Sequence, residues 1–339
     1  MYETEQYNNN ILIIGNGFDI HHGYKTKYSD FLQFIIDNNF DNKASDRFNR
    51  IVNNNCFINC FKKTYSVNST WIDLENEIEK LTEMFSEIFS ILDNNNKVNK
   101  YVEFSELKAG YDQFKMVELF KDIFRCENRK IAMIGYEYVN DSVYDKEKII
   151  NKLQNLLDEV IEAVQIYITD HSGVDEKIYK KSSQISNIKA DYVINFNYTD
   201  TILEYDINPS NVVYVHGRAE DIKTMVLGTK DTNDDFIYFN KSFQRLQKWN
   251  DIIDYKKFEE RMVFDGKTRN VLHIYGHSLD DTDGDILRKA FDKSEEYRIY
   301  YYNQLDYENK IINLFKVFGR QKVCDWMENH KLLPIKIEN

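Results

Sequence analysis

The sequence is poor in the residues that mark metal-bound, disulfide-linked and turn-rich proteins. Its four cysteines, Cys56, Cys60, Cys126 and Cys324, form no paired Cys-x-x-Cys knuckles, which argues against a zinc ribbon and a disulfide framework. Only 2 prolines and 12 glycines occur in 339 residues, so asparagine and aspartate must make most of the turns. We therefore expect a reducing, cytoplasmic compartment and no bound metal.

Positive charge is also scarce. The chain has 44 basic and 56 acidic side chains, a net charge of −12, which is the wrong sign for a protein that grips phosphate backbones nonspecifically. No apolar run reaches the roughly 18 residues of a membrane helix, and the start of the chain lacks the basic and apolar regions of a signal peptide. The sequence therefore predicts no membrane association and argues against nucleic acid as a direct substrate.

The chain does contain an apolar strand that leads into a Gly-x-Gly turn near its start. Ile11–Ile14 runs into Gly15 and Gly17, the pattern of a buried strand followed by a tight turn and a helix. Glycine lets the backbone approach a pyrophosphate, and a helix N-terminus offers N–H donors. The full dinucleotide fingerprint would need a third glycine at Ile20, so an ordinary strand-to-helix turn remains the alternative.

Long helices are indicated in the next part of the chain, from about residue 40 to residue 186. Apolar side chains recur at alternating steps of three and four over Leu74–Leu92 and Ile149–Val164. The pattern predicts a large helical insertion that covers the sheet or forms an oligomer interface, and we expect a homo-oligomer. The segment Lys130–Ile134 fits either a short strand or the end of a helix.

Five further apolar segments each end in a turn of polar or small residues, and we interpret them as strands. In an open parallel sheet all strand carboxyl ends lie along one edge, where ligands bind. The sequence therefore predicts one α/β domain over residues 1–339, with a Rossmann-like, mainly parallel sheet and the helical insertion at about 40–186. The expected strands are Tyr192–Ile194, Val212–Val215, Met225–Leu227, Val271–Tyr275 and Tyr297–Tyr302, and the expected later helices are Asp235–Trp249, Gly284–Lys293, Glu308–Phe318 and Gln321–Asn329.

The turns at these strand ends carry a resemblance. The opening Ile14-Gly-Asn-Gly-Phe-Asp-Ile-His-His-Gly23, the internal Asn195-Phe-Asn-Tyr-Thr199, the Val215-His-Gly217 after it and the late Tyr275-Gly-His-Ser-Leu-x-x-x-Asp283 occur in this order. Together they resemble the AbiH family of bacterial phage abortive-infection proteins, over most of the chain. That family is in turn similar, more distantly, to sirtuin-like NAD-consuming proteins.

The resemblance implies a sirtuin-like fold, NAD as the substrate and a role for each matching residue. The sequence departs from the sirtuin pattern at Asn16 and at Phe18-Asp19, which replace small residues. The sequence also lacks the paired zinc cysteines of deacetylating sirtuins. Protein deacylation is therefore disfavoured, whereas hydrolysis of NAD needs no zinc module. The implied nucleotide-binding residues are Gly15, Asn16, Gly17, Phe18, Gly276, Ser278 and Asp283, with Asn197 organising a ribose hydroxyl and a water and His216 as the catalytic histidine.

The chemistry of the individual residues leaves an alternative for each. His216, beside Gly217 at a strand end, can titrate near neutral pH and accept a proton, or it can simply bond a neighbouring loop. Asn197 can donate and accept at a ribose hydroxyl, or make a turn. Asp19 would repel a pyrophosphate, so it either caps the first helix or contacts a ribose hydroxyl. His273 lies inside a strand and is expected in the core.

Our leading hypothesis is an NAD glycohydrolase in antiphage defence, which cleaves NAD to nicotinamide and ADP-ribose. His216, Asn197 and Asp19 would be catalytic, and the protein would respond to a phage-derived trigger or a defence partner protein. The alternative is a non-catalytic module that senses NAD or a related nucleotide and acts through a partner. A nuclease is the weakest hypothesis, because the metal-carboxylate motif is missing.

Overall fold

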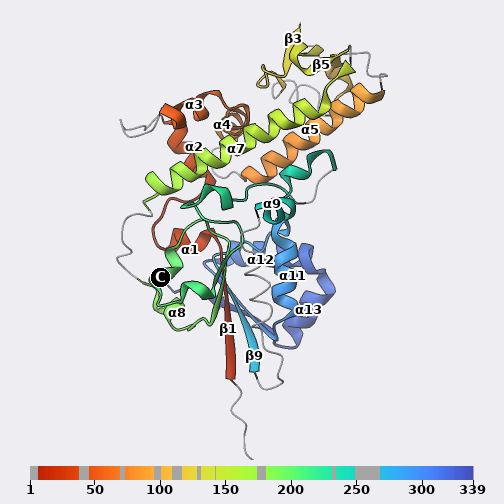
Figure 1. Cartoon of the computed structure of the whole chain (residues 1–339). Coiled ribbons are helices and arrows are strands. Elements are labelled where there is room, and N and C mark those ends of the chain that lie inside the picture. Colours follow the sequence, from red (N-terminus) through yellow and green to blue (C-terminus); the bar gives the residue numbers. More distant parts are fainter. Residues whose placement is uncertain are drawn as a thin grey trace, which may run out of the picture. The chain divides into compact units, whose positions relative to one another are not determined.

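A computed structural model describes residues 7–37, 46–68, 73–94, 101–108, 117–127, 131–141, 143–173, 181–230, 234–248 and 268–338. The chain forms two compact units, whose elements are labelled in Figure 1. The sheet unit comprises Met1–Lys27, Gln165–Val226 and Gln244–Asn339, and the helical unit comprises Tyr28–Val164 and Leu227–Phe243. Because three segments of one unit alternate with two of the other, the chain passes between the units four times.

The sheet unit is built on six parallel strands in the order β11-β10-β9-β1-β7-β8. Numbered along the chain and counted from the β8 side, this order is 3-2-1-4-5-6, so the chain reverses direction across the sheet between β1 and β9. All six carboxyl ends lie along one edge, as the sequence predicted for an α/β protein. The strands are β1 (Tyr7–Ile14), β7 (Tyr192–Asn195), β8 (Val212–Tyr214), β9 (Thr268–Tyr275), β10 (Glu296–Tyr301) and β11 (Leu332–Lys336).

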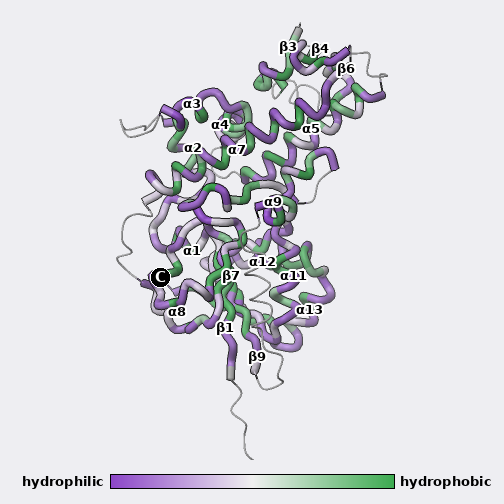
Figure 2. Tube along the Cα trace, in the orientation of Figure 1, coloured by the Kyte–Doolittle hydropathy of each residue, from purple (hydrophilic) through white to green (hydrophobic). Residues whose placement is uncertain are grey.

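The central strand β1 is apolar because both of its faces are covered. Ile11–Ile14 is at most 1% exposed, and its backbone pairs with β7 on one side and β9 on the other. Alternate residues enter two separate clusters of buried side chains, one on each face of the sheet. Figure 2 shows hydrophobic residues gathering where these strands run side by side.

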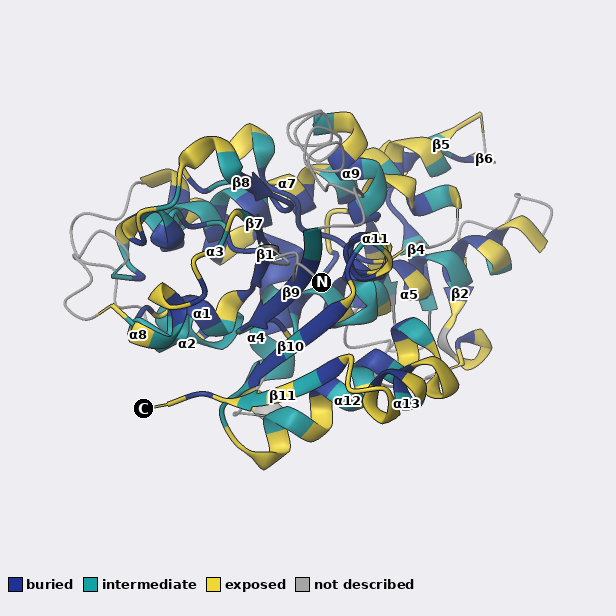
Figure 3. Cartoon of the chain, turned by 90° about the horizontal axis from the view of Figure 1, so that it is seen from below, coloured by how far each residue is buried: buried dark blue, intermediate teal, exposed yellow. Residues whose placement is uncertain are grey.

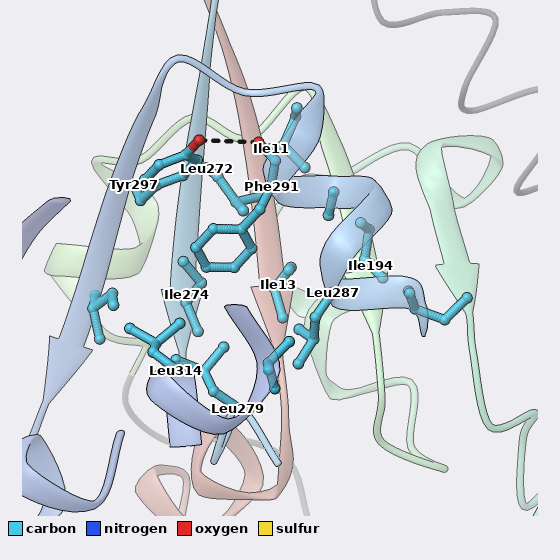
Figure 4. Close-up of a cluster of buried hydrophobic side chains, with 14 of the residues drawn as sticks. Ile11, Ile13, Ile194, Leu272, Ile274, Leu279, Leu287, Phe291, Tyr297 and Leu314 are labelled. Carbon is cyan, nitrogen blue, oxygen red and sulfur yellow. Dashed lines mark hydrogen bonds between the residues drawn. The ribbon is translucent and has the colours of Figure 1, made fainter. Parts of the chain in front are cut away.

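One face of the sheet is covered by the helices α11 (Gly284–Asp292), α12 (Gln304–Phe318) and α13 (Arg320–Glu328). Figure 4 shows the packing, in which the Tyr297 hydroxyl donates to the Phe291 carbonyl at 3.1 Å. Figure 3 shows β9 and β10 mostly buried, whereas α12 and α13 mix buried with exposed residues, as amphipathic helices do. The residues of this face include Ile11, Ile13, Ile194, Phe196, Leu272, Ile274, Leu279, Leu287, Phe291 and Leu314.

The other face carries a cluster that reaches α1 (Asn16–His21) and α8 (Ser183–Ser186). It includes Leu12, Ile14, Phe18, Ile185, Val193, Ile202, Tyr205, Tyr275 and Tyr300. His273 lies inside β9 at 2% exposure, which confirms the predicted core position. Burial, with a smaller effect of Arg298, lowers the pKa of His273 to about 4, so this imidazole is neutral in the folded protein at pH 7.

Two strand assignments differ from the sequence-based ones. The predicted strand Met225–Leu227 is wrong: its side chains are at most 2% exposed, but the Val226 N–H donates to the His216 carbonyl at 2.9 Å instead of joining the sheet. Buried loops and buried strands share the same apolar signature. β11 was not predicted, because Pro334 lies within it and proline is unusual in strands. The proline is tolerated because β11 is an edge strand of the sheet.

The helices predicted late in the chain are confirmed within a few residues. α11, α12 and α13 correspond to the three predicted after residue 283. The predicted helix Asp235–Trp249 is replaced by a 3-10 segment, η6 (Asp234–Phe239), and α9 (Lys241–Lys248), while Trp249 lies outside the described residues.

The helical unit contains long helices, as predicted, together with two small antiparallel sheets that were not. The segment Lys130–Ile134 contains the strand β4 (Ile131–Ile134), whereas Lys130 lies outside the described residues. The helices are α2 (Tyr28–Ile36), α3 (Asp46–Asn54), α4 (Cys56–Asn68), α5 (Leu74–Asn94) and α7 (Lys146–Asp170), the last of which continues into the sheet unit. The other strands are β2 (Tyr101–Glu103), β3 (Phe124–Glu127), β5 (Val139–Asn140) and β6 (Val143–Tyr144).

Much of the aromatic content of the sequence fills the core of the helical unit. Phe89 of α5 stacks on Phe236 with ring centroids 5.9 Å apart, and Phe57 of α4 lies 6.2 Å from Phe239. All four rings are at most 1% exposed. The segment Leu227–Phe243 is therefore held in this unit by aromatic packing.

The cysteines of α4 are buried thiols. Burial raises the pKa of Cys56 to about 11 and also raises that of Cys60, so both are protonated at neutral pH. Within the described ranges, His, Cys, Asp and Glu side chains form no group of three or more placed to hold a metal ion. In the same part of the chain, no helix combines the length and the apolar character needed to span a membrane.

Candidate functional site

The turns after β1 and β9 interlock through their glycine backbones. The Gly17 N–H donates to the Gly276 carbonyl at 2.8 Å, and Gly276 adopts a positive φ of 67°. A Cβ on Gly17 would lie 2.8 Å from Gly276 Cα, and one on Gly276 would lie 2.2 Å from the Phe18 nitrogen. Gly15 is packed as closely, against His277. These glycines are therefore required where one turn packs on another, and a role in holding phosphate stays a prediction.

Three of the predicted nucleotide-binding residues have side chains that do not belong to the buried polar groups at this edge. Asn16 is exposed and exchanges hydrogen bonds with Thr26. Phe18 is fully buried, with its ring 4.5 Å from that of His22, so it serves the core. Ser278 is exposed, and its carbonyl accepts from Asn313.

Asp19 is a buried carboxyl with an unusual environment. It is 1% exposed, and its Oδ2 accepts from the Thr199 hydroxyl at 2.7 Å, which in turn accepts from Thr201 at 3.1 Å. Among the described residues its Oδ1 has no hydrogen-bond partner. Burial raises the pKa of Asp19 to about 7, although the Thr199 and Thr201 hydroxyls act in the opposite direction. The capping alternative is wrong, because Gly15 is the N-cap of α1 and no side chain caps it.

Asn197 follows β7 and presents its amide to the same edge. Its backbone N–H donates to Asn195 Oδ1 at 2.8 Å, and Asn195 Nδ2 donates to the Thr199 carbonyl at 3.0 Å. Asn195, which sequence analysis passed over, therefore makes the turn. Asn197 is 5% exposed, and within the described part of the chain its Nδ2 has no hydrogen-bond partner. Its amide is thus available for a ligand oxygen or a water.

His216 follows β8 and forms a buried pair with Asp283. Its Nδ1 lies 3.1 Å from the Phe196 carbonyl, and its Nε2 lies 2.9 Å from Asp283 Oδ1. A carbonyl only accepts, so Nδ1 carries a proton, and a second proton is shared between Nε2 and Asp283. Both residues are 6% exposed. The structure therefore joins two predicted site residues, but both ring nitrogens face acceptors.

Two basic residues that sequence analysis did not assign to the site surround Asp283. His277 accepts from the Leu279 N–H through Nδ1 at 2.9 Å, which places its proton on Nε2, 3.8 Å from Asp283 Oδ2. Arg245 of α9 pairs with Asp285 at 2.6 Å and has Nη1 3.9 Å from Asp283 Oδ1. The strand-end position of His277 was a signal for it, whereas nothing in the sequence of α9 singled out Arg245.

The polar residues thus form two groups beside opposite faces of the sheet. The Asp19 group (Asp19, Thr199 and Thr201) adjoins Phe18, which belongs to the cluster of Leu12 and Ile14. The His216 group (His216, His277, Asp283 and Arg245) adjoins Phe196, which belongs to the cluster of Ile11 and Ile13. The turn from Asn195 to Thr199 joins the two groups, with Asn197 at its middle.

The profile of one protein family, described as bacteriophage abortive infection AbiH, matches residues 11–329. The chain belongs to the AbiH family. The matched range begins within β1, ends one residue after α13 and contains both polar groups. No curated protein matches the sequence. Family membership indicates a role in the abortive infection of bacteriophage.

The AbiH chain therefore presents two kinds of chemistry at one sheet edge. With a pKa of about 7, Asp19 exists in both protonation states at neutral pH, so it can exchange protons, and its ionised form can stabilise a cation. The His216 group offers buried N–H donors and positive charge, which suit an anionic ligand. Asn197 lies between them and supplies a neutral amide.

Proposed function

We propose that this AbiH protein is an NAD glycohydrolase that depletes NAD during phage infection. Breaking the nicotinamide–ribose bond of NAD builds positive charge on the ribose ring, as in other glycoside cleavages. A buried carboxylate beside that ring stabilises the cation far more than one in water would. The observation that carries the proposal is Asp19, a 1% exposed carboxyl with a pKa near 7 and one oxygen without a partner among the described residues.

The strand order supports a dinucleotide as the ligand. The order 3-2-1-4-5-6 is that of doubly wound sheets that bind dinucleotides in the crevice where the strand order reverses. In this chain the reversal lies between β1 and β9. Asp19 lies in α1, the helix that follows β1, and His277 lies in the turn after β9. This order supports the Rossmann-like sheet that the strand pattern predicted and is compatible with the sirtuin-like fold that the resemblance implied.

The residues then take distinct roles in the proposed reaction. Ionised Asp19 stabilises the developing ribose cation, and the amide of Asn197 holds a ribose hydroxyl or the attacking water. His216 acts as a positioning residue, because its two nitrogens face the Phe196 carbonyl and Asp283 and so fix the turn that carries Asn197. The reaction needs no electron transfer, since water replaces nicotinamide at the ribose carbon.

The test is nicotinamide release from NAD by the purified protein and by Asp19→Asn. We expect turnover in the wild type to rise with pH through about 7 as Asp19 ionises. Asp19→Asn should lower the rate by about 10²–10³-fold, the loss typical of one electrostatic contact to the transition state. The matched control is Asp191→Asn, an exposed carboxyl that accepts from the Asn10 N–H at the amino end of β7. A rate for Asp19→Asn equal to that of Asp191→Asn would refute the assigned role.

A second candidate, a non-catalytic nucleotide sensor, is favoured by one observation. Both nitrogens of His216 already face acceptors, so this histidine is built to hold a structure together. A sensor would be stabilised by NAD in thermal melts and lose that response in His216→Ala. It would release no nicotinamide, even when a phage lysate is added.

A further inference from the structure

Arg245 is a buried cation at the carboxyl edge of the sheet. Not all of its N–H donors have an acceptor among the described residues. Its side chain is 8% exposed, and its Nη2 donates to Asp285 Oδ2 at 2.6 Å. Its Nη1 is buried and has no hydrogen-bond partner among the described residues. A guanidinium presents five N–H donors in a fixed plane, and a buried donor without an acceptor destabilises the fold. The geometry of Arg245 therefore calls for an acceptor from outside the described chain.

The charge around Arg245 indicates that this acceptor is an anion. The Oδ1 atom of the buried residue Asp283 lies 3.9 Å from Arg245 Nη1. The same Oδ1 lies 2.9 Å from His216 Nε2, and one proton is shared between these two atoms. The His216–Asp283 pair has no net charge wherever that shared proton resides. The other carboxylate, Asp285, has a side chain 44% exposed, so water screens its charge. The positive charge of Arg245 is therefore only partly neutralised by the carboxylates around it.

A helix N-terminus lies beside the guanidinium and adds to the same field. α11 begins at Gly284, directly after its N-cap residue Asp283, whose side chain makes no capping hydrogen bond. The Gly284 N–H already donates to the Asp281 carbonyl of the preceding 3-10 turn, η7 (Asp281–Asp283), so this helix end contributes mainly through its dipole, which attracts anions. α11 follows the turn after β9, at the place where the strand order reverses. Arg245 and the dipole of α11 are separate features that favour the same class of ligand.

We infer that Arg245, assisted by the dipole of α11, binds a phosphate of the nucleotide substrate. The inference rests on the proposed function, because it names the part of NAD that this group of residues recognises. It places the phosphate beside the turn after β9. At the turn after β1 the Gly17 and Phe18 N–H groups likewise donate to carbonyls, those of Gly276 and Gly15, at 2.8 Å, so the buried guanidinium of Arg245 is what distinguishes the turn after β9.

The experiment compares ADP with adenosine, which differ only in the phosphates. Thermal melts and titration calorimetry are done on the whole protein, on Arg245→Met and on Arg245→Lys. The control is Arg269→Met, at the amino end of β9, where a half-exposed guanidinium pairs with Glu296 at 2.8 Å. Arg245→Met should fold, because its partner Asp285 reaches solvent.

We expect ADP to bind the wild type more tightly than adenosine, and Arg245→Met to weaken ADP by about 10- to 100-fold while leaving adenosine unchanged. Arg245→Lys should recover only part of this loss, because an ammonium lacks the planar fork. Arg269→Met should behave as the wild type. If Arg245→Met retains the full preference for ADP, or if the wild type shows none, the assignment is wrong.

A second readout separates this inference from the proposed reaction. NAD and nicotinamide riboside share the scissile bond, but the riboside carries no phosphate. Arg245→Met should raise KM for NAD about 10- to 100-fold and leave turnover of the riboside unchanged. An ADP preference that Arg245→Met abolishes, in a protein that never releases nicotinamide, would support the phosphate site and reject NAD hydrolysis.

Discussion

Asp19 opposes folding at neutral and alkaline pH, because its ionised form is buried. Its pKa is 3.8 in an unfolded chain and about 7 in the folded protein, so folding binds a proton between these values. The penalty therefore grows as pH rises from about 4 to 7 and is complete above 7. This behaviour separates Asp19 from an ordinary surface carboxyl, whose ionisation leaves stability nearly unchanged.

We predict that Asp19→Asn is more stable than the wild type at pH 8, by up to about 4 kcal/mol, and loses this advantage at pH 4. Asparagine removes the ionisable group and keeps an acceptor for the Thr199 hydroxyl. Urea unfolding at the two pH values measures the difference. Asp191→Asn, exposed at the amino end of β7, should show no such pH dependence. An equal effect of Asp19→Asn at both pH values would show that the carboxyl is already ionised in the folded state at low pH.

At the same scale, the sequence predicts some members of the site and not others. Asn197 and His216 were identifiable because they follow strands, and the ends of parallel strands share one edge, whereas Asp283 was identified through the family resemblance. The pairing of His216 with Asp283 was not predicted, since it depends on the path of the chain after β9. Arg245 was missed because its role comes from the carboxylates it meets in space, which α9 does not encode.

Among the elements, the interlocked turns after β1 and β9 tolerate the least change of residue, because glycine is required where their backbones touch. Gly276→Ala should destabilise the protein by at least about 3 kcal/mol, because a positive φ and a backbone clash act together. Its Cβ would lie 2.2 Å from the Phe18 nitrogen. The matched control is Gly23→Ala, which has a φ of 88° but no heavy atom within 4 Å of the new Cβ.

Gly23→Ala should therefore show only the conformational cost, about 1–2 kcal/mol. Urea unfolding of both variants, each compared with the wild type, measures the difference between them. Equal losses would mean that the two turns separate easily, and that the contact between them does not hold this edge of the sheet together.

Elements with a regular pattern were predicted well, and irregular ones were not. β1, β7 and β9 are apolar runs buried on both faces, and α12 has an amphipathic period, so each pattern has one simple interpretation. Met225–Leu227 has the same composition as a strand but gives a backbone hydrogen bond to a loop. The apolar composition of a segment predicts its burial well. It predicts less well which backbone groups the segment will hydrogen-bond to.

For the whole molecule, the division into two units makes a prediction about deletions. Removing Tyr28–Val164 alone would leave the segment Leu227–Phe243 without the unit that it packs in. Phe236 and Phe239 would lose their contacts with Phe89 and Phe57 and expose large apolar rings. We expect that deletion to aggregate.

Removing both segments, with short linkers at the junctions, should leave a protein that unfolds cooperatively. The reason is that the six strands and their two apolar clusters lie in the remaining segments. Size-exclusion chromatography and circular dichroism during heating compare the two deletions. If the single deletion folds as well as the double one, the aromatic packing does not hold Leu227–Phe243 in the helical unit.

The central place of β1 in the sheet also has a consequence during synthesis on the ribosome. β1 ends at Ile14, and its nearest partner in sequence, β7, begins at Tyr192, which is 192 − 14 = 178 residues later. At a translation rate of about 5–20 residues per second, β1 therefore has no partner strand for roughly 10 to 35 s after it is synthesised. A chain whose translation stops in that interval carries Asp19 but neither Thr199 nor Asn197. Under the proposed function, an enzyme that harms its own cell is assembled only from chains whose translation has gone far beyond that point.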